Sequence, residues 1–167
     1  MAEKRMIPRM EWASYMNTGT KEAPVWSRIG EGFTDLSETK EAVEYARHYV
    51  HEKTERRDVM GYAPTIAFSC DMHSGDPVIK RIADVHDLEL VGTEAQAEIV
   101  SVNLYEPVAG RGFKAFKRRY TVLPDTKGEG VEALILTGAF AAAGDMEPGA
   151  FDPEAGVYTA GLEGGDG

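Results

Sequence analysis

The sequence predicts a mostly β protein, a sandwich or barrel of two packed antiparallel sheets with one flanking α-helix and an extended N-terminal arm. Several short segments alternate apolar and polar residues, turn residues separate them, and one segment alone has the apolar spacing of a helix. A chain of 167 residues with 43% hydrophobic content has the size of a single domain with one core. The expected parts are the arm over residues 1–24, the β domain over residues 25–160 and a flexible tail over residues 161–167.

The arm shows no sustained period of either kind, yet it holds the large apolar residues Trp12, Tyr15 and Met16. An aromatic cluster without a core of its own is expected to pack on something else. The sequence leaves open whether this is the rest of the chain or a neighbouring subunit. After the arm, residues 25–29 are expected to form a short strand that ends at a glycine turn, and residues 33–36 a second extended piece.

Residues 37–57 fit two periods. The helical set is Val43, Ala46, Tyr49 and Val50, and the alternating set is Val43, Tyr45, Arg47 and Tyr49. Glutamate and lysine favour a helix here, whereas β-branched and aromatic residues favour a strand, so the sequence leaves both open for residues 38–50. The charged run over residues 52–58 is predicted to be a solvated loop.

The clearest signals lie between Gly61 and Gly92. Alternation from Pro64 onward predicts a half-buried strand whose core-facing residues are Ile66, Phe68, Cys70 and Met72. A turn follows, and there Asp76 is expected to cap a helix over about residues 77–88, with proline at its first position and Gly92 at its stop. The apolar stripe expected to dock on the sheet is Val78, Ile79, Ile82, Ala83 and Val85.

The last third of the chain is expected to contain only strands and turns. The predicted strands cover residues 97–106, 113–123 and 131–143, separated by a hairpin loop over residues 107–112 and a turn over residues 124–130. A further hairpin is expected over residues 149–159 around the Pro and Gly of residues 152–156, and residues 162–167 are expected to be disordered.

Composition excludes several function classes. With 28 acidic and 18 basic residues the net charge is -10, which disfavours a general affinity for nucleic acid. No apolar stretch reaches the ~18 residues that a membrane helix needs. The single cysteine, Cys70, is expected to be a buried apolar residue, because it lies on the core-facing side of its strand.

No catalytic, cofactor or metal site is expected. Ser69, Asp71 and His73 share one face of a strand, but alternate positions lie ~6.5–7 Å apart, too far for a nucleophile to contact its base. Asp71 and His73 together with His86 lack the spacing of a metal motif. The glycine pairs at residues 30–32 and 110–112 lack the remaining residues of phosphate-binding loops, so both are interpreted as turns.

A basic cluster over residues 114–119 is interleaved with aromatic residues, the composition of a nucleic-acid platform. In so acidic a chain, pairing with the carboxylates of a neighbouring subunit is the preferred interpretation. The candidate contact residues between subunits are Trp12, Tyr15, Arg111, Lys114, Lys117, Arg118 and Arg119.

Four short motifs follow one another along the chain: WSRIGEG from Trp26, VMGY from Val59, GDPV from Gly75 after the Phe68 strand, and GD followed by GAFD from Gly144. In this order and spacing they resemble the major tail (tail tube) proteins of long-tailed bacteriophages, over most of the chain from Trp26 to Tyr158. The resemblance implies a non-enzymatic virion protein without cofactors. Six copies would form a ring through a continuous inner β-barrel, and stacked rings would form a hollow tube for DNA.

The resemblance also implies partners and a location. The partners would be further copies of the chain, the tape measure, tail terminator and distal tail proteins, and passing DNA that is not bound specifically, with no membrane involved. The chain would be made in the cytoplasm of the host bacterium and end in the virion tail.

The net charge suggests an acidic lumen. Six copies would carry about -60 per ring, and an acidic wall would keep passing DNA from sticking. The lumen candidates are Glu98, Glu106 and Glu132, on the strands expected to be long and regular. The competing interpretation is that these carboxylates pair with the basic cluster across subunit boundaries. A small-molecule-binding β-barrel is the alternative function, and a hydrolase built on the Ser69 and His73 face ranks third.

Overall fold

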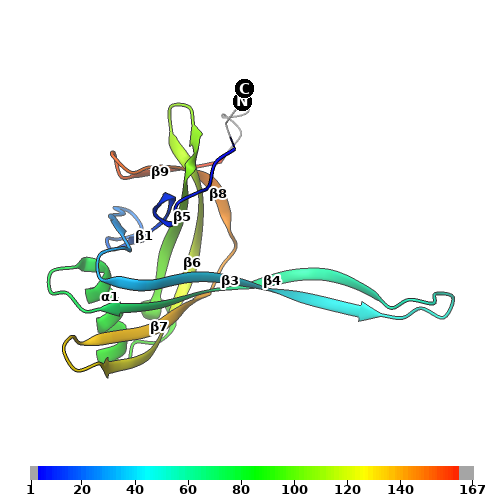
Figure 1. The fold of residues 1–167 in the computed structure, drawn as a ribbon, viewed down its shortest axis with the longest axis horizontal. Coiled ribbons are helices and arrows are strands. Elements are labelled where there is room, and N and C mark those ends of the chain that lie inside the picture. Colours follow the sequence, from blue (N-terminus) through cyan, green and yellow to red (C-terminus); the bar gives the residue numbers. More distant parts are fainter. Residues whose placement is uncertain (1–3, 162–167) are drawn as a thin grey trace.

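The computed structural model describes residues 4–161, which form an antiparallel sheet of nine strands with one α-helix (Figure 1). The strands are β1 (Trp12–Asn17), β2 (Trp26–Arg28), β3 (Phe33–Arg47), β4 (Arg56–Asp71), β5 (Gln96–Val108), β6 (Gly112–Glu129), β7 (Ile135–Ala142), β8 (Glu147–Asp152) and β9 (Val157–Ala160). The helix α1 covers Pro77–Asp87, and two 3-10 turns cover Arg9–Glu11 and Gly92–Ala95.

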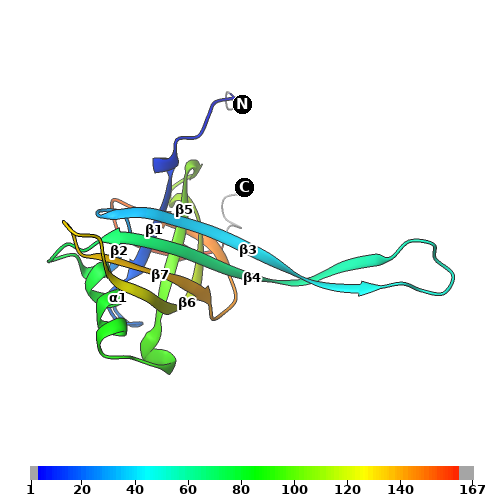
Figure 2. The same ribbon diagram turned by 60° about the horizontal axis from the view of Figure 1, so that its bottom comes forward.

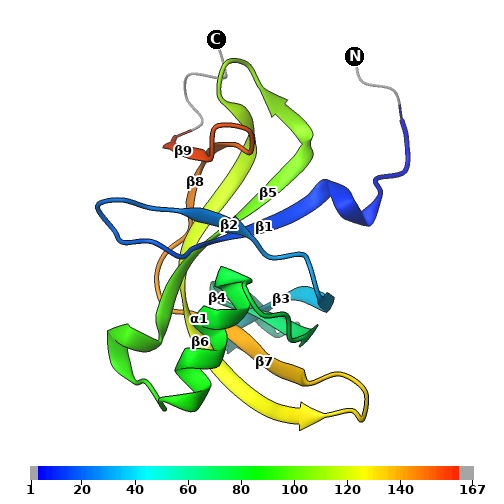
Figure 3. The ribbon, with the colours of Figure 1, turned by 90° about the vertical axis from the view of Figure 1, so that its left-hand side faces the viewer.

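The two layers expected from the sequence belong to one continuous sheet. Its strand order is β2-β1-β5-β6-β7-β4-β3, and β8 pairs with β6 and β9. The cause is the length of β6, whose first half pairs with β5 and β8 while its second half pairs with β7. Figure 3 shows the β8 and β9 hairpin near one end of this long strand and β7 near the other.

The larger of two core clusters lies between α1 and the sheet. All five residues of the predicted helix stripe are buried, and the Asp76 carboxylate accepts hydrogen bonds from the N–H groups of Val78 and Ile79. Ile66, Phe68 and Cys70 are buried in this cluster, and Met72 packs against it. The predicted facing of the strand and of the helix is therefore confirmed. The helix ends at Asp87, earlier than the predicted stop at Gly92, which instead begins a 3-10 turn.

The N-terminal segment contributes a strand to the sheet, which the sequence did not predict. Strand β1 pairs with β2 and β5, and its four central residues, Ala13, Ser14, Tyr15 and Met16, are all buried. Met16 belongs to the cluster beneath α1, whereas Ala13 and Tyr15 belong to a second cluster with Phe151. A strand that is buried on both faces has no apolar alternation, which explains why the segment seemed to lack a period.

Of the ambiguous residues 38–50, residues 38–47 are in a strand, and none of them is helical. Strand β3 continues to Arg47 and pairs with β4, which begins at Arg56 rather than at the expected residue 64. The charged run over residues 52–58 is thus only partly loop. The outer part of this hairpin projects far from the rest of the chain (Figures 1 and 2). Local periodicity left helix and strand open for this segment, and pairing with the distant strand β4 makes it a strand.

Most other predicted strands are confirmed, with shifted boundaries between β6 and β7. Strand β5 and the start of β6 lie where alternation placed them, β8 and β9 form the predicted hairpin, and β2 matches the short strand after the arm. The predicted turn over residues 124–130 is wrong, because β6 continues to Glu129 and β7 begins only at Ile135. The predicted disorder of residues 162–167 concerns a segment outside the described residues.

The stacking of Phe68 on Phe140, with ring centroids 4.7 Å apart, makes Phe68 a sensitive position in the larger core cluster. The substitution Phe68→Ala is expected to lower the free energy of unfolding by about 3–5 kcal/mol, because it leaves a cavity. The neighbouring control, Ala67→Ser on the exposed side of the same strand, is expected to change it by less than about 0.5 kcal/mol. Urea titration of the monomer measures both values, and equal stabilities of Phe68→Ala and the parent would contradict the core assignment.

Candidate subunit interface

Strands β6, β7, β4 and β3 form a run of four consecutive antiparallel strands, with β3 at one edge and the last part of β6 at the other. Strand β3 pairs with β4 alone, and β6 pairs with β5 only as far as Thr121, so residues 122–129 of β6 pair with β7 alone. Within residues 4–161, no strand covers either edge. Unpaired edges of this length invite another strand, and soluble proteins ordinarily protect them.

The backbone groups that face outward on β3 follow from two observations. The Leu36 carbonyl accepts a hydrogen bond from Arg9 Nη2 at 2.9 Å, and Arg9 does not belong to β4. Four residues further on, Lys40 stands opposite Pro64, which has no N–H to donate. The register between these two pairs is unbroken, so every second residue, namely Leu36, Glu38, Lys40 and Ala42, turns its N–H and C=O toward the free edge.

One face of the four-stranded sheet lies under α1, and the opposite face is open. Residues that pair across the sheet share a face. On β4 and β7 the intervening residues on the opposite face belong to the buried core: Ile66, Phe68, Cys70, Leu136 and Phe140. The small residues of this open face are Ser37, Thr39, Ala63, Thr65, Ala67, Ser69, Thr121, Thr137, Ala139 and Ala141. Asp35, Glu41 and Asp71 stand at its ends, and Arg119 and Leu123 stand at its margin on β6.

Of the glutamates predicted for the lumen, Glu98 and Glu106 lie on β5, and Glu98 stands opposite Arg119. The Glu98 carboxylate is 3.7 Å from Lys117 Nζ, and the Glu106 carboxylate is 3.5 Å from Lys114 Nζ. Glu132 lies in the exposed turn between β6 and β7, not on a strand. Glu98 and Glu106 therefore pair with the basic cluster within one chain. The competing interpretation from the sequence had placed this pairing across subunit boundaries.

The basic cluster on β6 does not form one continuous patch. Lys114 and Arg118 point to one side of the strand, while Lys117 and Arg119 point to the other, because side chains alternate along a strand. Lys117 lies between the carboxylates of Glu98 and Glu147 and over the Tyr158 ring, 4.8 Å from its centroid. Burial and the charge of Glu147 raise the pKa of the Tyr158 hydroxyl.

The side of β6 that carries Lys114 and Arg118 borders a cleft of about 170 Å³ between β3 and β6. Arg118 lines it together with Glu38, Lys40 and Tyr120, whose pKa is raised to about 12 by burial and by the nearby Glu38 charge. Lys114 Nζ lies 5.7 Å from the centroid of the Phe116 ring, which also lines the cleft.

The remaining contact candidates are divided between core and surface. The Tyr15 ring is buried against Phe151, with centroids 4.5 Å apart, so it packs in the core of its own chain. Trp12 is half-buried beneath the Arg9 guanidinium, which lies 5.0 Å from the ring centroid. Arg111 donates to the Gly161 carbonyl at 2.8 Å, and Arg119 is exposed at the end of the β5 and β6 pairing.

Of the polar residues considered for catalysis, His73 makes a local contact with the backbone. Its Nδ1 lies 2.8 Å from the carbonyl oxygen of Asp71, two residues earlier. Cys70 is fully buried, and burial raises the pKa of its thiol to about 11. Within residues 4–161 there is no group of three or more side chains suited to a metal ion. No helix in that range is long and apolar enough to cross a bilayer.

No protein-family model matches the sequence, and no curated protein matches it. Among solved structures, the fold is similar to a chain in a structure described as the virion of a native gene transfer agent (GTA) particle. The TM-score is 0.55 at 11% identity, and the match covers 87% of this chain and 100% of that one.

Two further structures are similar. One is the tail of an empty GTA particle with C6 symmetry, with a TM-score of 0.53 at 11% identity, covering 84% of this chain and 97% of that one. The other is the baseplate of the anti-feeding prophage, with a TM-score of 0.50 at 14% identity, covering 89% and 97%. The mostly β fold with one flanking helix is thus shared with chains of these particles.

The assignment of free backbone groups on β3 can be tested in the monomer. The substitution Thr39→Pro removes an N–H that faces β4 and is expected to lower the free energy of unfolding by about 1–3 kcal/mol. The substitution Lys40→Pro removes an outward N–H and is expected to cost less than about 1 kcal/mol, since proline is tolerated on edge strands. Chemical denaturation of both variants, with Lys40→Ala as control for the lost side chain, gives the comparison. A reversed order would show that the alternation is out of phase.

Proposed function

We propose that the chain is a structural subunit of a tail tube, in which rings of copies stack into a hollow conduit for DNA ejection into a host cell. The observation that carries the proposal is the pair of free edges on opposite sides of one four-stranded sheet. The fold shared with chains of the GTA virion and tail supports it.

The strand directions suit closure into a ring. The four strands alternate in direction, so β3 and β6, at the two sides of the sheet, run antiparallel to each other. When β6 of one copy meets β3 of the next copy in the same orientation, the new pair is antiparallel, and the arrangement repeats around a rotation axis. Six copies then give a barrel of roughly 24 strands, and closure pairs both free edges of the four-stranded sheet. The C6 symmetry of the similar GTA tail is consistent with six.

The open face is our candidate for the lumen wall, in place of Glu98, Glu106 and Glu132. Because α1 covers the other face of the same sheet, a barrel made from this sheet has α1 outside and the open face inside. The small neutral side chains of this face offer DNA phosphates no cationic partner, Arg119 at its β6 margin is the exception, and Asp35, Glu41 and Asp71 supply negative charge at its ends. DNA would therefore pass without being retained.

Further parts of the proposal rest on the same assembly. The segment over residues 37–57 and the N-terminal segment contact other copies, within a ring or between rings. The partners at the tube ends and inside it are the terminator, distal tail and tape measure proteins, and the chain is made in the host cytoplasm. We assign it no catalytic role. Nothing favours a small-molecule-binding barrel, because the four-stranded sheet keeps two free edges within the chain.

The edge-pairing step predicts that Lys40→Pro blocks assembly although the monomer stays folded. The neighbouring strand would lose a hydrogen bond and leave a buried carbonyl unpaired, at about 1–3 kcal/mol for each interface. Sedimentation velocity and electron microscopy at high concentration would report rings and tubes for the parent and for Lys40→Ala, and monomers for Lys40→Pro. Normal tubes of Lys40→Pro would rule out pairing at this edge.

The lumen assignment predicts that tubes of the double variant Thr65→Lys and Thr137→Lys assemble and retain DNA at low salt. Repeated cations along the wall bind phosphates by counterion release, so retention should fall steeply as salt rises. The matched control is Leu88→Lys on the exposed side near α1, which adds charge to the outer surface. DNA inside the lumen is protected from nuclease, whereas DNA on the outside is digested. Tubes of the double variant that protect no DNA would refute the assignment.

A further inference from the structure

The first part of the β3 edge lies beside the N-terminal segment of the same chain. Arg9, in the 3-10 turn before β1, donates from Nη1 to the Trp12 carbonyl at 2.8 Å and from Nη2 to the Leu36 carbonyl at 2.9 Å. The guanidinium also lies over the Trp12 ring, 5.0 Å from its centroid. Leu36 is one of the β3 residues that turn their N–H and C=O toward the free edge. One outward carbonyl of this edge is therefore already occupied within the chain.

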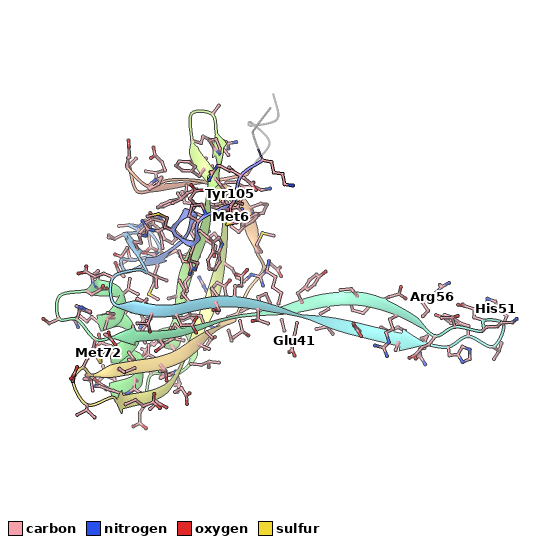
Figure 4. All side chains as sticks on the ribbon, in the orientation of Figure 1. Met6, Glu41, His51, Arg56, Met72 and Tyr105 are labelled. Carbon is pink, nitrogen blue, oxygen red and sulfur yellow. The ribbon has the colours of Figure 1, made fainter. Side chains whose placement is uncertain are left out.

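The occupied carbonyl lies in the part of β3 that belongs to the four-stranded sheet. Residues 33–39 of β3 pair with residues 65–70 of β4, and those β4 residues pair on their other side with β7. Beyond this range β3 and β4 continue as two strands into the projecting hairpin, defined as residues 42–62, with Glu41 at its root (Figure 4). A strand that extends the four-stranded sheet thus runs along residues 33–39, and Leu36 lies at their centre.

The N-terminal segment is held over this edge by polar contacts rather than by apolar packing. A cleft of about 300 Å³ lies between them, lined by Arg9 and Met10 on one side and by residues 33–37 on the other. The large apolar side chains of the segment are not buried against β3, because Met6 is 91% exposed, Met10 72% and Ile7 49%. Few contacts would have to break for the segment to leave the edge.

We infer that residues 4–11, named here the N-terminal strap, form an autoinhibitory contact on the β3 edge. In the single chain, Arg9 holds the strap beside Leu36 and protects this part of the edge from unspecific pairing. When β6 of another copy pairs with β3, a backbone N–H replaces Arg9 at the Leu36 carbonyl and the strap detaches. This inference rests on the proposed ring and adds a control on when its edges pair.

Removal of the strap contact should promote assembly. Arg9→Ala is expected to lower the critical concentration for tube assembly about tenfold, because pairing no longer has to displace a charge-assisted hydrogen bond. The matched control is Arg5→Ala, which removes the same charge from the strap but only a contact to Glu11, at 2.8 Å within the strap itself. Sedimentation velocity over a concentration series measures both variants. An unchanged or raised critical concentration for Arg9→Ala, or an equal effect of Arg5→Ala, would overturn the inference.

Detachment of the strap can be measured as a distance within one chain. Spin labels at Ile7→Cys and Glu31→Cys mark the strap and the turn before β3, and both positions are exposed, whereas Cys70 is fully buried and should remain unlabelled. Doubly labelled chains are diluted in excess parent protein, so that pulsed electron paramagnetic resonance reports only the pair within a chain. We expect a longer distance in tubes than in monomers.

The two hypotheses fail in different ways. An unchanged distance in tubes would show that the strap stays on β3, which would overturn the autoinhibitory contact and leave the proposed tube intact. Parent protein that never forms rings or tubes would contradict the proposed tube itself.

Discussion

The structure depends on the burial of one face of the four-stranded sheet beneath α1. Ile66, Phe68, Leu136 and Phe140 must all face the helix, and because side chains alternate along a strand, a slip of one residue would expose the whole set. This constraint sets the register of β3, β4 and β7. The register in turn determines which side chains form the open face and which backbone groups of β3 point outward. The proposed interface thus follows from the packing of the core.

In a chain folded in this way, backbone N–H and C=O groups on the two free edges have no strand to pair with among the described residues. The two free edges and the projecting hairpin are the parts that gain nothing from the fold of one copy, and each would be an aggregation hazard on a lone soluble protein. A ring satisfies both needs at once, since edge pairing supplies hydrogen bonds while the hairpins bury apolar surface. The surfaces that would form the tube are then the same surfaces that could cause aggregation. A closed symmetric arrangement distinguishes an ordered tube from disordered association.

The distribution of charge is consistent with this division. Two of the glutamates first considered for the lumen are paired with lysines of the same chain, so they stabilise the sheet locally and are partly neutralised. The open face is instead dominated by alanine, serine and threonine. In the proposed tube, a wall of mostly small neutral residues would offer DNA few cations, with Arg119 at its margin as the exception, and the acidic residues at its ends would add repulsion. The net charge of -10 described the chain as a whole and could not locate this face.

The sequence by itself determined the elements whose patterns are local. The half-buried strand around Phe68, the capped helix from Pro77 with its stripe, and the final hairpin were predicted because one buried face leaves a clear period, as caps and turns leave clear residues. Only the tertiary structure decided β1, which is buried on both faces, and the outer half of β3, which is exposed on both faces. In neither case does burial alternate along the strand. The free edges, the open face and the pairing of Glu98 with Lys117 depend on which distant strands meet, and a period within one segment carries no information about its partner.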